Sequence, residues 1–192
     1  MNALLEAPIH PRRTRTRTRT RRRRPAAVLA SLLVLLAIYT GWTNARPYRL
    51  SSSIELEATP DEVWRVLSDL RAYDQWNPFI VSASGTVRED ATLRLVLRDK
   101  TGDTTFTPTV LAADAGRELR WIGRIGPGLV FDGEHRFVID QVGSHRVRLT
   151  QSEAFSGVAV PFYRSTLKSN TLPQFRALNR ALADRLAELR DS

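Results

Sequence analysis

The sequence predicts an α+β fold, in which an antiparallel sheet of about seven strands packs its apolar face on one long C-terminal helix, with a separate transmembrane helix before it. Three observations carry this prediction. Apolar and polar residues alternate through much of residues 91–156, which is the pattern of half-buried strands. Leucines and aromatics recur at helical spacing from 167 to 189 on an otherwise polar background. Residues 26–42 contain no charge at all.

The positive charge of the chain is concentrated in its first 25 residues. The formal net charge is +9, and residues 1–25 hold nine arginines against Glu6, which leaves only +1 for the rest of the chain. The run RTRTRTRTRRRR has like charges that repel and no apolar side chain to bury, so we expect residues 1–25 to be a disordered arm. Arginine runs bind nucleic acid through phosphates. Beside a membrane span, however, such a run fixes topology and contacts anionic lipid, and we favour anionic lipid as its partner over nucleic acid.

The uncharged segment predicts a transmembrane helix over residues 26–45. A spanning helix needs about 20 apolar residues, and Tyr39 and Trp42 lie at the far end, where aromatic rings favour the headgroup layer. Arginines on the preceding flank place the N-terminus in the cytoplasm and residues 46–192 outside the cytoplasmic membrane. The alternative is a secretory signal cleaved after Ala45, although its apolar core is longer than the usual one of about 7–15 residues.

Residues 46–192 form the globular part, which opens with a strand and a capped helix. Ile54 and Leu56 alternate with acidic residues, as in a half-buried strand. Thr59 can cap a helix, Pro60 suits its first position, and Glu62 completes a capping box. The helical region ends before Asn77-Pro78, because the residue before proline is pushed out of the helical basin.

A hairpin of two long strands carries the most informative polar residues. The strands GEHRFVID and RVRLTQSEAF turn near Gly143, so that one apolar face also holds a histidine, a glutamine and a glutamate. Folding about Gly143 pairs Ile139 with Val147, Phe137 with Leu149, and His135 with Gln151, with Glu153 diagonal to His135. Buried charge is costly unless it is paired. The cluster is therefore a structural pair, a polar anchor for a ligand, or an acid–base pair.

The globular part resembles the helix-grip superfamily called SRPBCC, which includes START-type lipid-transfer domains and aromatic polyketide cyclases. The resemblance covers about residues 50–189 and rests on ATPDEVWRVLSDLRAYDQWNPFI, the GEHRF strand, SEAFSG, and the closing helix with LNRAL. It implies an apolar cavity between the curved sheet and the last helix. It does not imply a reaction, because one fold hosts many functions.

The candidate ligand-binding residues are the aromatics and polar groups expected to face that cavity. Aromatics on alternating strands are core side chains unless they leave space between them. The stretch YDQWNPFI either plugs the end of the core or gates the pocket. The predicted set is Trp76, Phe79, Phe106, Trp121, His135, Phe137, Gln151, Glu153, Phe155 and Phe175.

Together these features predict a membrane-anchored domain that binds a hydrophobic or amphipathic small molecule, lipid-like or aromatic, without turnover. The alternatives are a cyclase- or dehydratase-like enzyme that uses the same cavity, and a protein-interaction module with a filled core. The chain has no cysteine, no HExxH motif and no Gly-rich phosphate loop, so we expect no metal, no nucleotide and no other cofactor. No serine or threonine is marked as a nucleophile.

Overall fold

The computed structural model describes residues 23–99 and 102–191, so the predicted arm lies outside the described residues as far as residue 22. The chain divides after Ile38 into two units. The first contains most of helix α1 (Arg23–Ala45); the second, Tyr39–Ser192, contains its last turns and both sheets. The other elements are β1 (Tyr48–Leu56), α2 (Pro60–Ser68), the 3-10 turn η2 (Leu70–Ala72), α3 (Tyr73–Trp76), β2 (Ile80–Ser84), β3 (Arg94–Asp99), β4 (Gly102–Phe106), β5 (Thr109–Asp114), β6 (Glu118–Arg124), β7 (Asp132–Gly143), β8 (Arg146–Ser156) and α4 (Val160–Asp191).

Helix α1 has the length and composition of a membrane span over Pro25–Ala45, and among the described residues it is the one helix that does. Its large apolar side chains up to Ile38 are all exposed. A signal sequence near the N-terminus has the same character, so the helix alone does not distinguish an anchor from a signal.

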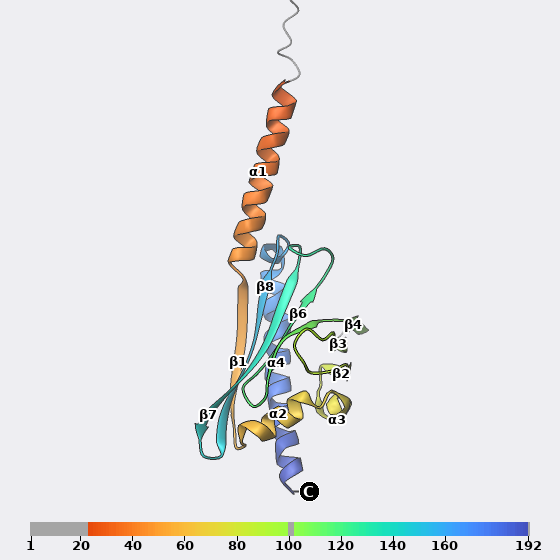
Figure 1. Cartoon of the computed structure of the whole chain (residues 1–192), viewed down its shortest axis with the longest axis vertical. Helices are drawn as coiled ribbons and strands as arrows, with labels where there is room; N and C mark the ends of the chain where they lie inside the picture. The colour runs from red at the N-terminus through yellow and green to blue at the C-terminus, as the bar shows by residue number, and fades with distance from the viewer. Residues whose placement is uncertain (1–22, 100–101, 192) are drawn as a thin grey trace, which may run out of the picture. The chain divides into compact units, whose positions relative to one another are not determined.

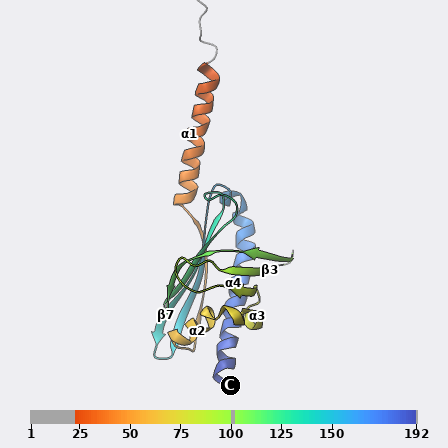
Figure 2. The same ribbon diagram turned by 45° about the vertical axis from the view of Figure 1, so that its right-hand side comes forward.

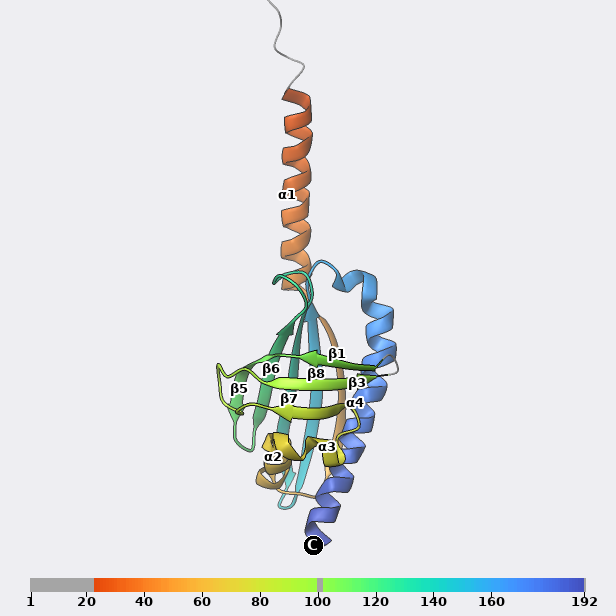
Figure 3. The same ribbon diagram turned by 90° about the vertical axis from the view of Figure 1, so that its right-hand side faces the viewer.

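The domain contains eight described strands in two antiparallel sheets, which confirms the predicted fold class. Five strands follow the order β1-β8-β7-β6-β5, and β2-β3-β4 form a second sheet that crosses the first in Figure 3. A bridge between Thr92 and Thr109 links the two sheets. The segment DTTFTPTVL contributes to two strands, β4 and β5. Pro108 separates them because it has no backbone N–H for a ladder.

The predicted capping box at the start of α2 is present. The Glu62 N–H donates to Thr59 Oγ1 at 3.3 Å, and the Thr59 N–H donates to Glu62 Oε2 at 2.7 Å. These hydrogen bonds from Thr59 lower the pKa of the Glu62 carboxyl. The helix buries Val63, Val66 and Leu67.

The Asn77-Pro78 turn is held by the asparagine side chain. Asn77 Oδ1 accepts from the N–H groups of Phe79 and Ile80 at 3.0 and 2.8 Å, which turns the chain from α3 into β2. Before the turn, the Tyr73 hydroxyl donates to the Leu67 carbonyl at 2.7 Å, and burial raises the pKa of this phenol. The turn is therefore fixed by buried polar contacts as well as by proline.

Helix α4 is the long C-terminal helix that the leucine spacing predicted, and it lies along the five-stranded sheet (Figures 1 and 2). It buries Thr171, Phe175, Leu178, Leu182 and Leu186. The last four pack into or beside the main core, which also contains Leu67, Leu119 and Phe137, whereas Leu189, at the end of the predicted stripe, is exposed.

The predicted register of the β7–β8 hairpin is wrong by two residues. The observed pairs are Ile139 with Leu149, Phe137 with Gln151, and His135 with Glu153. The loop is Ser144-His145 rather than a turn about Gly143, and an irregularity between Gln141 and Gly143 shifts the ladder once more. Because a shift of two residues keeps every side chain on its face, the predicted polar cluster survives the correction.

Candidate functional site

A cavity of about 260 Å³ lies between the inner faces of the two sheets and α4. Strands β2, β3, β4, β6, β7 and β8 and the middle of α4 contribute to its wall. Apolar side chains dominate, and besides Thr104 and Thr171 four longer polar side chains from β7, β8 and α4 stand among them: His135, Gln151, Glu153 and Gln174. The other lining residues are Phe79, Ile80, Leu95, Leu97, Thr104, Phe106, Trp121, Gly123, Ile125, Phe131, Gly133, Phe155, Leu167, Thr171, Phe175 and Leu178.

Two glycines on neighbouring strands shape the wall. A Cβ on Gly123 would collide with the ring of Phe106, so this glycine lets the β4 aromatic lie directly on β6. A Cβ on Gly133 would lie 2.6 Å from Glu153 Oε1. The lack of a side chain at Gly123 and Gly133 therefore allows Phe106 and the Glu153 carboxylate to take these positions.

His135 joins Gln151 and Glu153 into one hydrogen-bonded row. Its Nδ1 lies 3.1 Å from Glu153 Oε2, and its Nε2 lies 3.1 Å from Gln151 Nε2. A carboxylate only accepts and an amide NH₂ only donates, so this geometry fits a neutral imidazole with its proton on Nδ1. Both side chains of this pair are largely buried: 12% of the His135 side chain and 20% of the Glu153 side chain are exposed.

Aromatic rings hold the imidazole from three sides. The Trp121 ring stacks on it at 4.9 Å between centroids and 9° between planes. Phe137 lies tilted at 4.8 Å, and Phe175 from α4 meets it edge-on at 5.3 Å. The histidine therefore cannot swing away without disturbing the core.

Two polar atoms in this row are not used by the protein. Gln151 is 1% exposed, and its Oε1 has no hydrogen-bond partner among the described residues. Glu153 uses Oε2 for His135, whereas Oε1 has no described hydrogen bond and lies over Gly133. A buried acceptor without a partner costs about 1–3 kcal/mol. Gln151 Oε1, the buried atom of the two, therefore favours a molecule in the cavity that donates a hydrogen bond.

The structure brings eight of the ten predicted site residues to this one cavity. They are Phe79, Phe106, Trp121, His135, Gln151, Glu153, Phe155 and Phe175. Phe137 is 1% exposed and lies behind the wall, where it supports His135 and Trp121.

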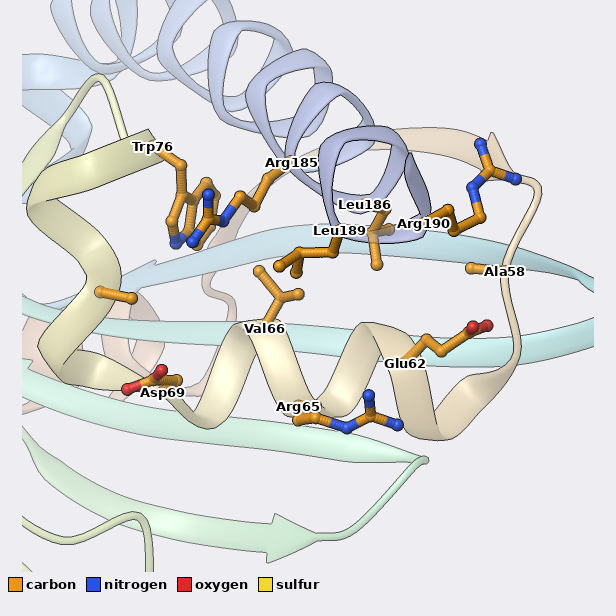
Figure 4. Close-up of a pocket in the computed structure, with 11 residues that line it drawn as sticks. Ala58, Glu62, Arg65, Val66, Asp69, Trp76, Arg185, Leu186, Leu189 and Arg190 are labelled. Carbon is orange, nitrogen blue, oxygen red and sulfur yellow. The ribbon is translucent and has the colours of Figure 1, made fainter. Parts of the chain in front are cut away.

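Trp76 lies in a different place, a surface groove of about 270 Å³ between α2, α3 and the end of α4. Figure 4 shows Val66 and Leu189 pointing into this groove from facing helices, with Arg185 beside Trp76. Trp76 packs edge-on against Tyr73 at 5.1 Å. The tryptophan of YDQWNPFI therefore closes the domain's end, whereas Phe79 of the same stretch reaches the cavity.

Sequence reasoning missed most of the residues that α4 contributes. Thr171 lies four residues after Leu167, on the face of the predicted helical stripe, and Gln174 follows three residues later. A threonine and a glutamine near Phe175 on an apolar helix face were the available signal. Ile125 and Leu167 carried no comparable signal, because their role depends on where the β6–β7 connection meets the helix.

The chemistry open to this site is binding through apolar contact and hydrogen bonds, or proton transfer through His135 and Glu153. No group of three His, Cys, Asp or Glu that could hold a metal occurs in the part of the chain that the structure describes. His135 Nε2, the atom that a general base would offer to a substrate, already accepts from Gln151 in the arrangement seen.

The helix-grip fold and its cavity define a protein of the SRPBCC superfamily. The family model described as "Polyketide cyclase / dehydrase and lipid transport" matches residues 47–189. The chain belongs to this family. No curated protein sequence matches it.

Solved structures share the fold at low sequence identity. A START superfamily protein from Mycobacterium smegmatis is 24% identical with a TM-score of 0.59, over 73% of this chain and 98% of that one. The Zhui aromatase/cyclase from a Streptomyces species is 15% identical with a TM-score of 0.61, over 74% and 94%. Norcoclaurine synthase from Thalictrum flavum, in complex with dopamine and hydroxybenzaldehyde, is 12% identical with a TM-score of 0.61, over 79% and 91%. At these identities the likeness shows the fold and not the activity.

Proposed function

We propose that this chain binds a small hydrophobic or amphipathic molecule in the cavity, at a membrane surface and without turnover. One observation carries the proposal: a mainly apolar cavity of about 260 Å³ holds a buried polar row with an unpartnered acceptor, Gln151 Oε1. A pocket of apolar lining with a few converging polar groups is the usual form of a small-molecule site.

The volume limits the ligand to a small one. Ligand sites usually measure about 300–1,000 Å³, and a cavity of about 150 Å³ accommodates benzene. A cavity of about 260 Å³ therefore suits one or two rings or a short acyl chain, and is too small for a two-chain lipid. The same volume counts against the alternative of a protein-interaction module with a filled core.

The polar row favours a ligand with hydrogen-bond donors. Gln151 Oε1 and Glu153 Oε1 are both acceptors without partners among the described residues. Among the described residues, this carboxylate is the one acidic group in the cavity wall, and no lysine or arginine lines it. A hydroxyl or amine on an apolar body thus fits better than an anion.

The second candidate is a cyclase- or dehydratase-like enzyme, favoured by the contact between His135 Nδ1 and Glu153. A carboxylate that orients an imidazole is the arrangement of many general bases. The hydrogen bond from Gln151 Nε2 counts against this role, because it occupies His135 Nε2, the nitrogen that a general base would offer to a substrate. Turnover would require Gln151 to move aside, so binding alone is the simpler proposal.

The membrane location rests on α1 and on the arginine-rich arm. We propose that α1 is a retained anchor with its N-terminus in the cytoplasm, and that the arm at residues 1–25 contacts anionic lipid. Thr43 is 4% exposed, and the Tyr39 hydroxyl donates to the Val158 carbonyl at 3.0 Å. Cleavage after Ala45 would remove both contacts from the folded domain, which favours the anchor over the signal.

Native mass spectrometry of the full chain, purified in mild detergent from its own host, tests the binding proposal. We expect a bound small molecule that survives gentle release from the micelle. The variant Thr171→Trp places a large ring in the cavity, so it should lose the bound mass. Asn170→Trp adds the same ring one residue earlier, on the exposed face of α4, and should keep it. Equal bound mass in both variants, or none in the parent, would refute cavity binding.

A further inference from the structure

Large exposed apolar side chains gather at one end of the domain. Among the described residues after α1, six large apolar side chains are exposed, and five of them lie in two segments. We call these five the apolar end surface: Ile125, Leu129 and Val130 in the β6–β7 connection, and Phe162 and Tyr163 at the start of α4. Phe162 is 80% exposed, which is unusual for a phenylalanine on a soluble surface.

The two segments are joined by backbone hydrogen bonds into one surface. The Val158 N–H donates to the Leu129 carbonyl at 3.0 Å, and the Ala159 N–H donates to the Val130 carbonyl at 3.1 Å. Gly157, at φ +120°, has no side chain to keep the segments apart where Val130 O lies against it. Beneath them, Phe131 meets Tyr163 edge-on at 6.4 Å. These backbone hydrogen bonds and the ring contact therefore hold the two segments with the exposed apolar side chains together.

This surface lies at the end of the domain that follows the anchor. Strand β1 begins there at Tyr48, which pairs with Phe155 at the end of β8, and Figure 1 shows the β6–β7 connection and the start of α4 at the same end. Only Arg46 and Pro47 separate α1 from β1. Three Cα–Cα steps span at most about 11 Å.

The span and the short linker set the distance to the bilayer. A helix of 21 residues, Pro25–Ala45, is about 31 Å long, close to the hydrocarbon thickness of about 30 Å. With α1 as the anchor, Tyr39 and Trp42 mark the headgroup layer, and Ala45 and Tyr48 follow within that layer or just above it. The bond from Tyr39 to Val158 ties the last turns of α1 to the segment that carries the apolar end surface.

The charges around the surface suit a bilayer with anionic lipid. Arg46 and Arg49 lie just before and on the first residues of β1, Arg164 and Lys168 lie in the first turns of α4, and residues 157–170 contain no acidic side chain. The Arg164 guanidinium lies 5.4 Å over the Tyr48 ring, as basic side chains do when their stems cover apolar surface. Arg124 is balanced by Asp132 at 3.7 Å. An apolar centre with a basic rim is the pattern of interfacial membrane binding.

The cavity reaches the outside of the domain next to the apolar end surface. Of its lining residues only Thr104 and Ile125 are exposed, and Ile125 belongs to the apolar end surface. Phe131 also lines the cavity and supports Tyr163.

We propose that the apolar end surface inserts into the headgroup layer of the bilayer that holds α1, so that the cavity exchanges its ligand with the membrane rather than with water. The inference rests on the proposed anchoring and ligand binding. Its partner is lipid and not a second protein, because the linker leaves too little room for a protein between this end and the bilayer.

Site-directed fluorescence in vesicles tests the inference on the full chain. The sequence has no cysteine, so one introduced cysteine carries one environment-sensitive nitrobenzoxadiazole label. Labels at Leu129→Cys and Phe162→Cys are compared with one at Ser144→Cys, in the exposed β7–β8 loop. The vesicles contain phosphatidylcholine and phosphatidylglycerol, with or without a lipid that carries a doxyl quencher. We expect emission at positions 129 and 162 to shift to the blue and to be quenched by the doxyl lipid, with neither effect at 144.

The outcomes separate this inference from the proposed function. If the labels at 129 and 162 show the same emission and quenching as the label at 144, and the vesicles retain the protein after an alkaline wash, the inference is overturned and the anchor still stands. Shielding that depends on protein density and not on the quencher would indicate a protein partner, and would overturn it as well. Release by the wash would overturn both the anchor and the inference. Phe162→Cys alone decides the result if Leu129→Cys does not fold, because Phe162 is 80% exposed.

Discussion

Glu153→Gln distinguishes a ligand anchor from a structural pair. Glu153 gives one oxygen to His135 Nδ1 at 3.1 Å, while the other lies over Gly133, and 20% of the side chain is exposed. Glutamine has the same shape and no charge, and its amide oxygen can still accept from the imidazole N–H. The substitution therefore removes the charge and keeps the hydrogen bond.

The cost in stability follows from that single change. A hydrogen bond to a charged group contributes about 1.5–3 kcal/mol, and a neutral one about 0.5–1.5 kcal/mol. The free energy of unfolding should therefore fall by roughly 1–1.5 kcal/mol. In a chain of this size each 1 kcal/mol shifts Tm by about 2–4 °C, so we expect a loss of roughly 2–6 °C. Breaking a dry, fully buried pair would instead cost about 3–5 kcal/mol.

The effect on binding should be larger than the effect on stability. A ligand donor that bonds to the Glu153 carboxylate loses about 1–3 kcal/mol when that acceptor becomes an amide. Affinity should fall by roughly fivefold to more than a hundredfold, since about 1.4 kcal/mol corresponds to a factor of ten. The bound fraction in native mass spectra measures this change.

Glu134→Gln is the matched control. Glu134 lies on β7 next to His135 but on the opposite face, where Arg120 Nη1 donates to it at 3.5 Å. We expect this control to keep both its Tm and its bound mass. A Tm loss above about 10 °C for Glu153→Gln, with unchanged bound mass, would show that the polar row is a structural plug.

Four further predictions concern the wall, a helix cap, the domain boundary and the topology. Gly123→Ala should destabilise the domain by about 1–3 kcal/mol through overpacking, and Phe106→Ala in the same chain should relieve most of that loss in a double-mutant cycle of melting temperatures. Thr59→Ala should cost about 1 kcal/mol. Because the pKa of Glu62 is lowered in the folded state, the stability that this carboxylate adds is present above its ordinary pKa and is lost as the pH falls through the folded value; denaturant titrations from pH 6 to pH 3 should show a smaller loss in the variant. A chain that begins at Tyr48 should fold but melt below one that begins at Tyr39, since it lacks Thr43 and the Tyr39 bond; equal melting would show that these contacts add nothing. Protease added to intact spheroplasts should digest residues 46–192, whereas full protection would reverse the topology, and intact mass would reveal cleavage after Ala45.

Local patterns in the sequence were sufficient for several elements and for part of the cavity lining. The capping box at Thr59 and the leucine stripe of α4 depend on neighbours within one or two turns, and both are present. A histidine, a glutamine and a glutamate on an apolar strand face marked the polar row, because such residues require partners. Period 2 assigns a side chain to a face, which is why eight of the ten predicted residues line the cavity.

The sequence could not predict how deeply each side chain is buried, or the register of the β7–β8 hairpin. Phe137 shares a face with His135, but its neighbours close over it, and only the three-dimensional packing decides which aromatics border space. Trp76 is separated from the cavity by the turn at Asn77, whose side chain fixes the direction of β2. The hairpin register depends on a two-residue loop and one irregularity, neither of which carries a strong local signal in QVGSHR.

The position of the cavity mouth explains how a small domain can keep an apolar opening. An exposed apolar patch on a soluble protein is a liability for aggregation. Ile125 lines the cavity and belongs to the apolar end surface together with Leu129 and Phe162, at the end of the domain where β1 follows α1 after Arg46 and Pro47. Against a bilayer the same side chains stabilise docking, and an apolar ligand would pass from lipid to the cavity without crossing water. In the proposed function the polar row would then meet the ligand in the cavity, where Gln151 and Glu153 would distinguish a molecule that donates hydrogen bonds from a plain hydrocarbon.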